Sequence, residues 1–405
     1  MRARYFGIVA AGIAAFALAF GGDAAWARNV VSGGATLPWP LYQDAIGKLP
    51  GGMFLPYAGT GSSTGLQAFL LNTPAALDRS GAVHWVGSET PLTQAQIDDY
   101  LAQGLGRGGD PASHGPLIQI PAAYVPVTIA YKGPAEPVAL NPTQLCAVFS
   151  GAISRWSQLG VAVPPSLDAF RLVFRAEGSG TTELLTRHLG AVCGNGGTPV
   201  FRGQALFADA FPPGGLPSHF AAAHGDGGVA SAMAASVSAI TYTGPDPVYT
   251  TGLKQAWLVN AHDGVAYLPT PANVIAAMES QGGNGLPTGP VVSRGPAGAG
   301  WSAPDNPANP ANWVRVSSDP LQGYPIVGST NFVLSQCYTD PAVTAAMRLF
   351  LKRHYEDIAL VASRQLVPLP APTRARLLAT FVLGSGGAQL NIGNPALCGD
   401  LAGRG

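Results

Sequence analysis

The sequence predicts an α/β fold in which short strands lead through small-residue loops into helices. Short apolar runs such as Val127–Tyr131 alternate along the chain with segments whose apolar residues keep helical spacing. Three of these units carry a loop rich in Gly, Ser and Thr between strand and helix. The 405 residues are enough for two or three domains with a sizeable core.

The elements follow from the apolar pattern and from capping signals. Asp340-Pro341 predicts a helix start, with Asp as the N-cap and Pro at the first helical position. A second C-terminal helix is expected over Pro372–Leu383. The pattern predicts strands at Phe54–Tyr57, Val83–Val86, Val127–Tyr131, Leu172–Phe174, Ile240–Tyr242 and Phe332–Ser335.

The N-terminus has the pattern of a secretory signal peptide over residues 1–27. Arg2 and Arg4 precede the apolar run Ile8–Phe20, and Ala25-Trp26-Ala27 supplies a small-x-small cleavage site. The apolar run is short for a membrane span, and no cysteine follows it to carry a lipid. We therefore expect a periplasmic or secreted protein.

The four cysteines fit an exported protein with disulfides. Four cysteines allow three connectivities, and the sequence alone does not choose among them. We favour Cys146–Cys193 and Cys337–Cys398, because each pair then lies within one stretch of chain. No pair has the Cys-x-x-Cys spacing of a zinc site, so we expect no metal.

The charge is balanced, with 22 basic and 22 acidic residues. A nucleic-acid partner is therefore not expected. An anion site would have to be built locally, since no general positive field would attract the anion.

The stretch "FRAEGSGTTELLTRHLG", Phe174–Gly190, has the pattern expected of an anion-binding site. Arg175 ends a predicted strand, and Ser179, Gly180 and Thr181 lead into a helix predicted over Thr181–Leu189. The free N–H groups of a first helical turn favour a negative charge, and an arginine fork matches tetrahedral oxyanions. An ordinary N-cap with a surface arginine is the alternative for this loop alone.

Two upstream corners repeat this design. "AGTGSSTGLQAFLLN" follows Phe54–Tyr57 and places Ser62 at a helix start, and "VVSGGATLPWPLYQ" places Thr36 and Leu37 at another. Carboxyl ends of strands are where open α/β sheets bind ligands. If the three loops converge, they form a cage of neutral donors around one arginine.

Two other patterns suggest different chemistry. Gly61-Ser62-Ser63-Thr64-Gly65 matches the G-x-S-x-G nucleophile elbow of serine hydrolases, but no histidine carries a supporting signature. His219, His224 and Asp226 fit no common metal spacing, and a solvated loop is the simpler interpretation.

Taken together, the motifs resemble those of the periplasmic phosphate-binding proteins (PstS-like) that serve phosphate ABC transporters, with the DING-type branch closest. The resemblance rests on five segments in this order, which cover most of the chain: "GGATLP", "GTGSSTGLQAFL", "VHWVGSETPL", "LCAVFSGAISRW" and "FRAEGSGTTELLTRHL". The two favoured disulfides also agree with the DING-type pattern.

The resemblance implies a two-domain Venus-flytrap fold, type II-like, with the ligand in the interdomain cleft. Residues 28–121 and 245–405 would form domain I, and 122–244 domain II. The chain would cross between them near Ile118–Val127 and again near Ile240–Gly244. The implied phosphate ligands are Thr36, Leu37, Ser62, Glu89, Arg175, Ser179, Gly180 and Thr181.

Glu89 departs from the family pattern, which has Asp at this place in "GSETPL". In the family this carboxylate accepts a hydrogen bond from the proton of hydrogen phosphate. Sulfate carries no proton at neutral pH and is rejected, because two acceptors would face each other. The longer Glu either widens the cleft or turns away from it.

The predicted function is capture of inorganic phosphate in the interdomain cleft for uptake by an ABC permease. We expect a monomer with no cofactor and no catalytic residues. The alternatives are a secreted phosphatase-like DING-type protein and a flytrap for another tetrahedral oxyanion such as arsenate.

Overall fold

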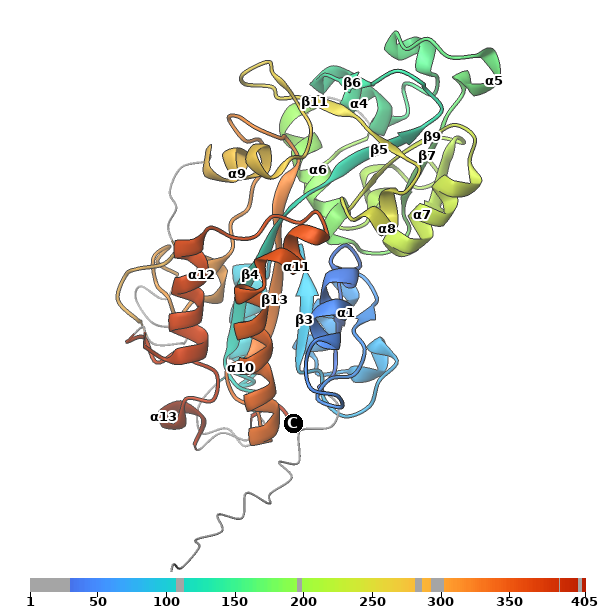
Figure 1. The fold of residues 1–405 in the computed structure, drawn as a ribbon. Coiled ribbons are helices and arrows are strands. Elements are labelled where there is room, and N and C mark those ends of the chain that lie inside the picture. The colour runs from blue at the N-terminus through green and yellow to red at the C-terminus, as the bar shows by residue number, and fades with distance from the viewer. Residues whose placement is uncertain are drawn as a thin grey trace, which may run out of the picture.

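The chain folds around two five-stranded sheets, one below the other in Figure 1. The structure, a computed structural model, describes residues 30–106, 113–194, 199–280, 286–292, 302–385, 387–399 and 403–405. The predicted signal peptide, residues 1–27, lies outside the described residues. Among those described, no helix has the length and apolar character needed to cross a membrane.

The first sheet has the strand order β2-β1-β3-β13-β4. Strand β1 pairs in parallel with β2 and β3, whereas β13 is antiparallel to both β3 and β4. Parallel strands bring their carboxyl ends to one edge, so the loops after β1, β2 and β3 meet there. The strands are β1 (Ser32–Gly34), β2 (Ala58–Gly59), β3 (Trp85–Ser88), β4 (Leu117–Pro126) and β13 (Val327–Ser335).

The second sheet has the order β10-β5-β9-β7-β8. Its β7 is parallel to β8 and β9, so the loop after β7 emerges at the carboxyl edge of this parallel part. A small third sheet, in the order β12-β11-β6, lies on the same side of the molecule (Figure 1). These strands are β5 (Thr128–Lys132), β6 (Ala139–Leu140), β7 (Arg171–Arg175), β8 (Phe220–Ala223), β9 (Ala239–Thr243), β10 (Lys254–Gln255), β11 (Trp257–Val259) and β12 (Ala266–Tyr267).

Two neighbouring segments connect the sheets. Strand β4 continues through Val127 into β5, which coincides with the predicted crossover at Ile118–Val127. The chain returns to the first sheet at Ile326, just before β13 begins. This second connection lies beside the first, because Val127 N–H donates to Ile326 O at 2.9 Å. The other predicted crossover, Ile240–Gly244, instead lies in and just after β9, inside the second sheet.

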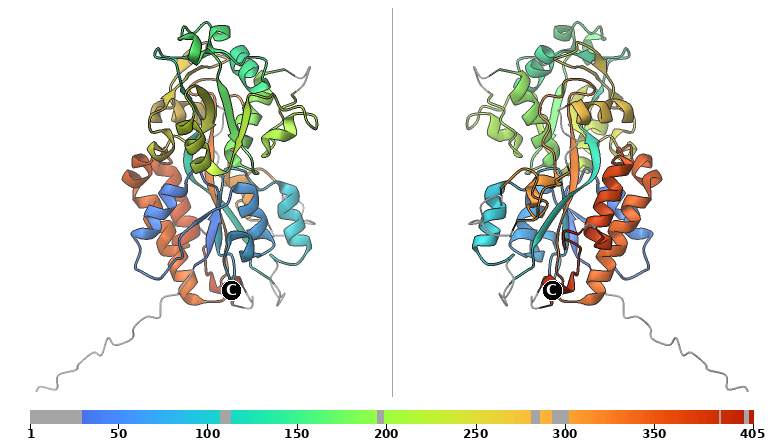
Figure 2. Two further views of the ribbon diagram at one scale, coloured as in Figure 1. Left: turned by 90° about the vertical axis from the view of Figure 1, so that its right-hand side faces the viewer. Right: turned by 90° about the vertical axis from the view of Figure 1, so that its left-hand side faces the viewer.

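Helices cover both sheets, and the views at right angles in Figure 2 show them on either side of the strands. The helices are α1 (Trp39–Gly47), α2 (Ser62–Leu70), α3 (Gln94–Ala102), α4 (Pro142–Ser150), α5 (Pro165–Asp168), α6 (Gly180–Val192), α7 (Gly225–Ala235), α8 (Pro247–Thr250), α9 (Pro271–Ser280), α10 (Pro341–Glu356), α11 (Ile358–Ser363), α12 (Ala371–Leu377) and α13 (Pro395–Cys398).

Most predicted elements are present, with two differences. The Phe54–Tyr57 strand is wrong: β2 begins only at Ala58, and Phe54 makes a single bridge to Val30. The Pro372–Leu383 helix is split, since α12 ends at Leu377 and a π-helical turn covers Leu378–Leu383. The predicted Asp340 cap of α10 is confirmed, because its side chain accepts from Ala342 N–H at 2.7 Å.

Both favoured disulfides are confirmed. Cys146–Cys193 joins the helix α4 to the residue after α6, and Cys337–Cys398 joins the end of the β13 segment to α13. Each crosslink closes a long loop, of 47 and 61 residues in sequence separation. Disulfides that close such long loops reduce the conformational entropy of the unfolded chain, which raises the free energy of unfolding.

We predict that replacing Cys146 and Cys193 together by Ser lowers the free energy of unfolding by about 4 kcal/mol, from the entropy of closing a loop of that length. Urea unfolding under oxidising conditions measures the change. Under reducing conditions, which open both disulfides, the double variant and the wild type should be equally stable. A variant as stable as the oxidised wild type would contradict the crosslinking role of this pair.

Candidate functional site

The loop after β7 leads directly into α6, as the sequence predicted. Ser179 caps α6, and its Oγ accepts a hydrogen bond from Thr182 N–H at 3.3 Å. The first-turn N–H groups of Gly180 and Thr181 have no partner inside the helix. Thr181 Oγ1 is buried and has no hydrogen-bond partner among the described residues. This corner therefore holds several donors that an anion could use.

Arg175, at the end of β7, is the centre of a buried polar cluster, with only 2% of its surface exposed. Its Nη1 donates to Asp226 Oδ2 at 2.6 Å, and its Nε donates to Glu177 Oε1 at 2.7 Å. Nη2 donates to Glu177 as well. One guanidinium thus faces two carboxylates, and these three side chains carry a net charge of about −1 at neutral pH.

Thr36 brings the first sheet into this cluster. Its Oγ1 accepts from Arg175 Nη2 at 2.7 Å and donates to Asp226 Oδ2 at 2.7 Å. Its carbonyl accepts from the Tyr249 hydroxyl at 2.7 Å. Because Thr36 follows β1 while Arg175 ends β7, these bonds join the two sheets.

Asp226 corrects the sequence interpretation of its segment as a solvated loop. The residue is fully buried at the start of α7, although the neighbouring His224 side chain is 84% exposed. Besides Arg175 and Thr36, it accepts from Thr243 Oγ1 at 2.9 Å and from Gly244 N–H at 3.2 Å. A buried carboxylate with four donors is a fixed structural charge rather than a surface group.

Ser62 and Glu89 form the facing side of the site. Ser62 Oγ, in the first turn of α2, donates to Glu89 Oε2 at 3.2 Å, and both residues are buried. A Cβ on Gly180 would lie 2.6 Å from Glu89 Cβ and 2.7 Å from Ser62 Oγ. Only glycine therefore fits at this point, where α6 meets the first sheet's loops.

Glu89 points into the buried cluster and does not turn away. Burial raises the pKa of Glu89 to about 7, and the negative charge of Asp226 adds to the rise, while Arg175 opposes it. Oε1 has no hydrogen-bond partner among the described residues. The side chain of Thr330 is the main influence that lowers the pKa of Glu89, and its hydroxyl also lies 3.2 Å from the hydroxyl of Tyr42.

The two sides touch at further points. Ser63 N–H donates to Gly178 O at 3.3 Å, and a Cβ on Gly61 would lie 2.9 Å from the same oxygen. Gly61 also has φ +92°, a conformation that glycine adopts without strain. Leu37 packs against Gly244, where an added Cβ would lie 2.7 Å from its Cγ. The loops of the two sheets are thus in direct contact.

All eight residues predicted to bind the ligand are buried in this one region. They come from the ends of β1, β3 and β7 and from the starts of α2 and α6. Sequence reasoning missed Glu177, Asp226 and Tyr249, which hold Arg175 and Thr36 in place. Glu177, two residues after Arg175, was the one signal that the sequence offered for a partner of this arginine.

The two sequence patterns that suggested a hydrolase or a metal site can be compared with the contacts among the described residues. Ser63, the middle residue of the G-x-S-x-G match, lies in α2, and no histidine of the described chain hydrogen-bonds to Ser62, Ser63 or Ser179. Across the described residues, no group of three or more His, Cys, Asp or Glu side chains is placed to hold a metal ion.

Comparison with known proteins agrees with this geometry. Residues 24–292 match the PBP superfamily domain. "Alkaline phosphatase L" of Pseudomonas aeruginosa is 34% identical over 380 residues, covering 92% of this chain and 94% of the relative. The crystal structure of a phosphate-binding protein from Stenotrophomonas maltophilia superposes with a TM-score of 0.76 at 33% identity, covering 93% of this chain and all of that one.

A third relative was solved with its ligand. The high-affinity periplasmic phosphate-binding protein PfluDING, bound with phosphate, superposes with a TM-score of 0.74 at 33% identity, covering 93% of this chain and 99% of that chain. The chain therefore belongs to the PBP superfamily, and within it to the DING-type phosphate-binding proteins.

We predict that Asp226→Asn lowers the free energy of unfolding by about 2–4 kcal/mol. The amide NH₂ would oppose either the donors of Arg175 and Thr36 or those of Thr243 and Gly244. Arg175 would also lose a buried, charged partner. Urea unfolding measures the change, and Asp209→Asn, an exposed acid of the same half, serves as the control, with less than about 0.5 kcal/mol expected. Equal effects of the two substitutions would show that the Asp226 ion pair is not structural.

Proposed function

We propose that the protein captures inorganic phosphate between the loops of its two sheets. The observation that carries this proposal is Arg175, a buried cation at the end of β7, the strand whose loop leads into the free N-terminus of α6 with Ser179 and Thr181. Ser62 meets this helix start at Gly180. These groups supply neutral donors together with a guanidinium whose charge Asp226 and Glu177 balance, and directional donors of this kind suit a tetrahedral oxyanion. The relatives solved as phosphate-binding proteins support the assignment.

The donors divide between the two sides of the site. Ser179, Gly180 and Thr181 would bind phosphate from the second sheet, and Thr36, Leu37 and Ser62 from the first. Arg175 would turn part of its fork from Thr36 and Asp226 to the ligand, while Glu177 keeps its Nε bond. Because the ligand then contacts both sheets, binding would stabilise the closed arrangement of the loops.

Glu89 would act as the acceptor for the proton of hydrogen phosphate. Oε1 is buried without a partner, so a ligand O–H can satisfy it. Sulfate at neutral pH has only acceptors to offer, and its approach to an ionised Glu89 would be repulsive. A Glu at this place therefore keeps the selection for phosphate that the shorter family Asp implies.

We propose that the protein has two domains. Residues 28–121 with 245–405 would form one domain and 122–244 the other, joined at Val127. Strand pairing favours moving the second boundary, because β10 belongs to the second sheet and the chain returns only near Ile326. The hinge would then be the adjacent pair Val127 and Ile326.

We further propose that the protein is a periplasmic or secreted monomer that delivers phosphate to an ABC permease and is not an enzyme. In the part of the chain that the structure describes, no histidine hydrogen-bonds to Ser62, Ser63 or Ser179, which supports binding without hydrolysis. The relative named alkaline phosphatase L keeps a phosphatase-like role as the alternative. Release of phosphate from p-nitrophenyl phosphate by highly purified protein, abolished in Ser62→Ala, would favour that alternative.

Isothermal titration of the chain from Arg28 onward with inorganic phosphate tests the function. We expect one site with micromolar or tighter affinity, and a loss of at least about a hundredfold in Arg175→Gln, which removes a charged, buried donor. Arg353→Gln, an exposed arginine on α10, is the control and should bind as the wild type does. No heat of binding at micromolar phosphate would reject the proposal.

The selection against sulfate should depend on pH through Glu89. The protonated carboxyl can donate to sulfate, and the ionised form cannot. With its pKa near 7, we predict that sulfate affinity levels off below pH 7 and falls about tenfold per pH unit above it.

Titration with sulfate between pH 5.5 and pH 8.5, about 1.5 units on either side of that pKa, measures this dependence. Glu89→Gln, which always has an amide donor, should show no such fall, whereas the exposed control Glu136→Gln should behave as the wild type. A sulfate affinity that is the same at all pH values in the wild type would rule out Glu89 as the selecting group.

A further inference from the structure

Thr330 is a buried threonine beside Glu89, on the strand that pairs with β3. In the antiparallel ladder of β13 and β3, Asn331 pairs with Ser88. Glu89 follows β3 directly, so the same register, continued by one residue, places Thr330 opposite Glu89. Side chains of directly opposite residues in an antiparallel pair lie on the same face, with Cβ atoms about 5 Å apart. The fold therefore brings the Thr330 hydroxyl to the Glu89 carboxylate.

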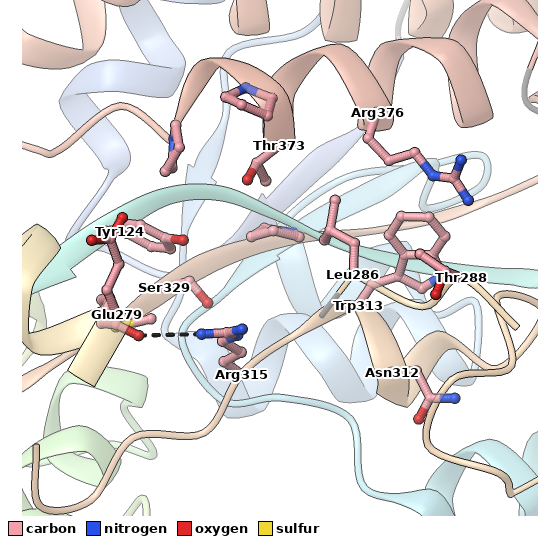
Figure 3. A pocket seen from close by; sticks show the side chains of 14 residues that line it. Tyr124, Glu279, Leu286, Thr288, Asn312, Trp313, Arg315, Ser329, Thr373 and Arg376 are labelled. Carbon is pink, nitrogen blue, oxygen red and sulfur yellow. Dashed lines mark hydrogen bonds between the residues drawn. The ribbon is translucent and has the colours of Figure 1, made fainter. Parts of the chain in front are cut away.

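The side-chain directions along β13 agree with this placement. Ser329 Oγ donates to Asn331 Oδ1 at 2.7 Å, so these two side chains share one face of the strand. Ser329 lines the cavity of about 500 Å³ shown in Figure 3. Pairing with β4 skips Ala122, so the extra residue of this bulge belongs to β4 and β13 keeps its alternation. Thr330 therefore points to the other face, away from that cavity and toward Glu89.

The surroundings of Tyr42 decide which way the hydroxyl protons point. The hydroxyl oxygens of Tyr42 and Thr330 lie 3.2 Å apart. Tyr42 is fully buried, and among the described residues Thr330 is the one acceptor for its hydroxyl proton. Burial holds the pKa of Tyr42 well above its usual value, so the tyrosine keeps this proton at neutral pH. Because a buried hydroxyl proton without an acceptor is costly, Tyr42 donates and Thr330 accepts.

The hydroxyl proton of Thr330 is then available to Glu89. Glu89 Oε1 has no fully formed hydrogen bond among the described residues, which leaves it open to this donor. A carboxylate has about four lone-pair sites, so it can accept from Thr330, from Ser62 and from a ligand O–H together. Against burial, which raises the pKa of Glu89, Thr330 lowers it more than the charged Arg175 does.

The other charged and titratable groups that face Glu89 do not replace this donor. Asp226 opposes ionisation of Glu89, and Arg175 favours it less than Thr330 does. Ser62, from α2, supplies a second hydroxyl with a smaller influence. Burial and, in smaller part, the charge of Glu89 raise the pKa of three neighbouring side chains, which stay neutral at pH 7: Tyr42, Tyr57 and Tyr249.

We propose that Thr330 is a positioning residue for anion selection. Its hydroxyl, held by Tyr42, donates to Glu89, keeps this carboxylate ionised and thereby sets the pH above which sulfate is rejected. The inference rests on the proposed phosphate site, in which ionised Glu89 accepts the proton of the ligand. Without the Thr330 hydroxyl, Glu89 would keep its own proton to a higher pH and would donate it to sulfate over that range.

Thr330→Val removes the hydroxyl, keeps the branched shape and tests the contact in the protein without ligand. We expect the pKa of Glu89 to rise from about 7 to about 8, because a hydrogen bond to the charged form is lost. NMR titration of isotope-labelled glutamate carboxyl carbons, in the chain from Arg28 onward, measures this pKa. The Glu89 signal is the one missing in Glu89→Gln. An unchanged pKa of Glu89 in Thr330→Val would overturn the proposal.

Three further variants show whether the effect belongs to the Thr330 hydroxyl. Thr330→Ser keeps the hydroxyl and should keep the wild-type pKa of Glu89. Ser329→Ala removes a buried hydroxyl from the opposite face of β13 and should not alter this pKa either. A rise in either variant as large as in Thr330→Val would contradict the proposal. Tyr42→Phe should leave the pKa of Glu89 near its wild-type value, since Thr330 still donates. A fall in Tyr42→Phe would show that Thr330 donates to Tyr42 in the wild type, which would also contradict the proposal.

Sulfate titration tests the consequence for selection. Near pH 8, a rise in the pKa from about 7 to about 8 takes the protonated fraction of Glu89 from about one tenth to about one half, so Thr330→Val should bind sulfate about fivefold more tightly than the wild type. Near pH 5.5, about 1.5 units below the wild-type pKa, Glu89 is protonated in both proteins and the affinities should agree. Equal sulfate affinities near pH 8 would refute the role in selection. Failure of the wild type to bind inorganic phosphate would reject the proposed function instead, and the NMR titration would still decide whether Thr330 acts on Glu89.

Discussion

The ion pair between Arg175 and Asp226 is the interaction on which the rest of the site depends. Both groups are buried, at 2% and 0% exposure, and Glu177 and Thr36 complete the surroundings of the guanidinium. A buried charge is tolerated only when partners compensate for the loss of water. Because Thr36 comes from the first sheet and Arg175 from the second, compensating this charge also fixes how the two sheets meet.

The same constraint explains why the site has so little positive charge. With two carboxylates around Arg175 and Glu89 opposite, a bound anion relies on hydroxyls and on backbone N–H groups at the start of α6. Such donors are directional, so they favour an anion of one geometry and proton content over anions that merely carry charge. The chain as a whole is neutral, with 22 acidic and 22 basic residues. It therefore provides no long-range attraction that would favour all anions alike and weaken the selectivity of the site.

The sequence predicted the fold class, the favoured disulfide pairs and the eight candidate ligand residues, which the structure brings into one buried region; the strand, loop and helix-start patterns behind the fold class are local signals. Capping residues, small-residue loops and chain order are local. The missed features depend on long-range contacts: Asp226 follows a glycine at the start of α7 with no distinctive sequence pattern, and only the approach of Arg175, 51 positions away, makes it a buried partner. The false strand at Phe54–Tyr57 has the right apolar pattern, but pairing with β1 begins only at Ala58. The sequence near Ile326 has no pattern that predicts the second crossover between the sheets. Ile326 lies beside Val127 only once the chain has folded.

A crystal structure of the protein with inorganic phosphate would test the central claim most directly. The account predicts phosphate between Ser62 and the start of α6, with Arg175 donating to it, Glu89 accepting its proton and Glu177 still bonded to Arg175. Phosphate bound elsewhere, or an Arg175 fork that stays wholly with Asp226, Glu177 and Thr36 while ligand is present, would contradict it.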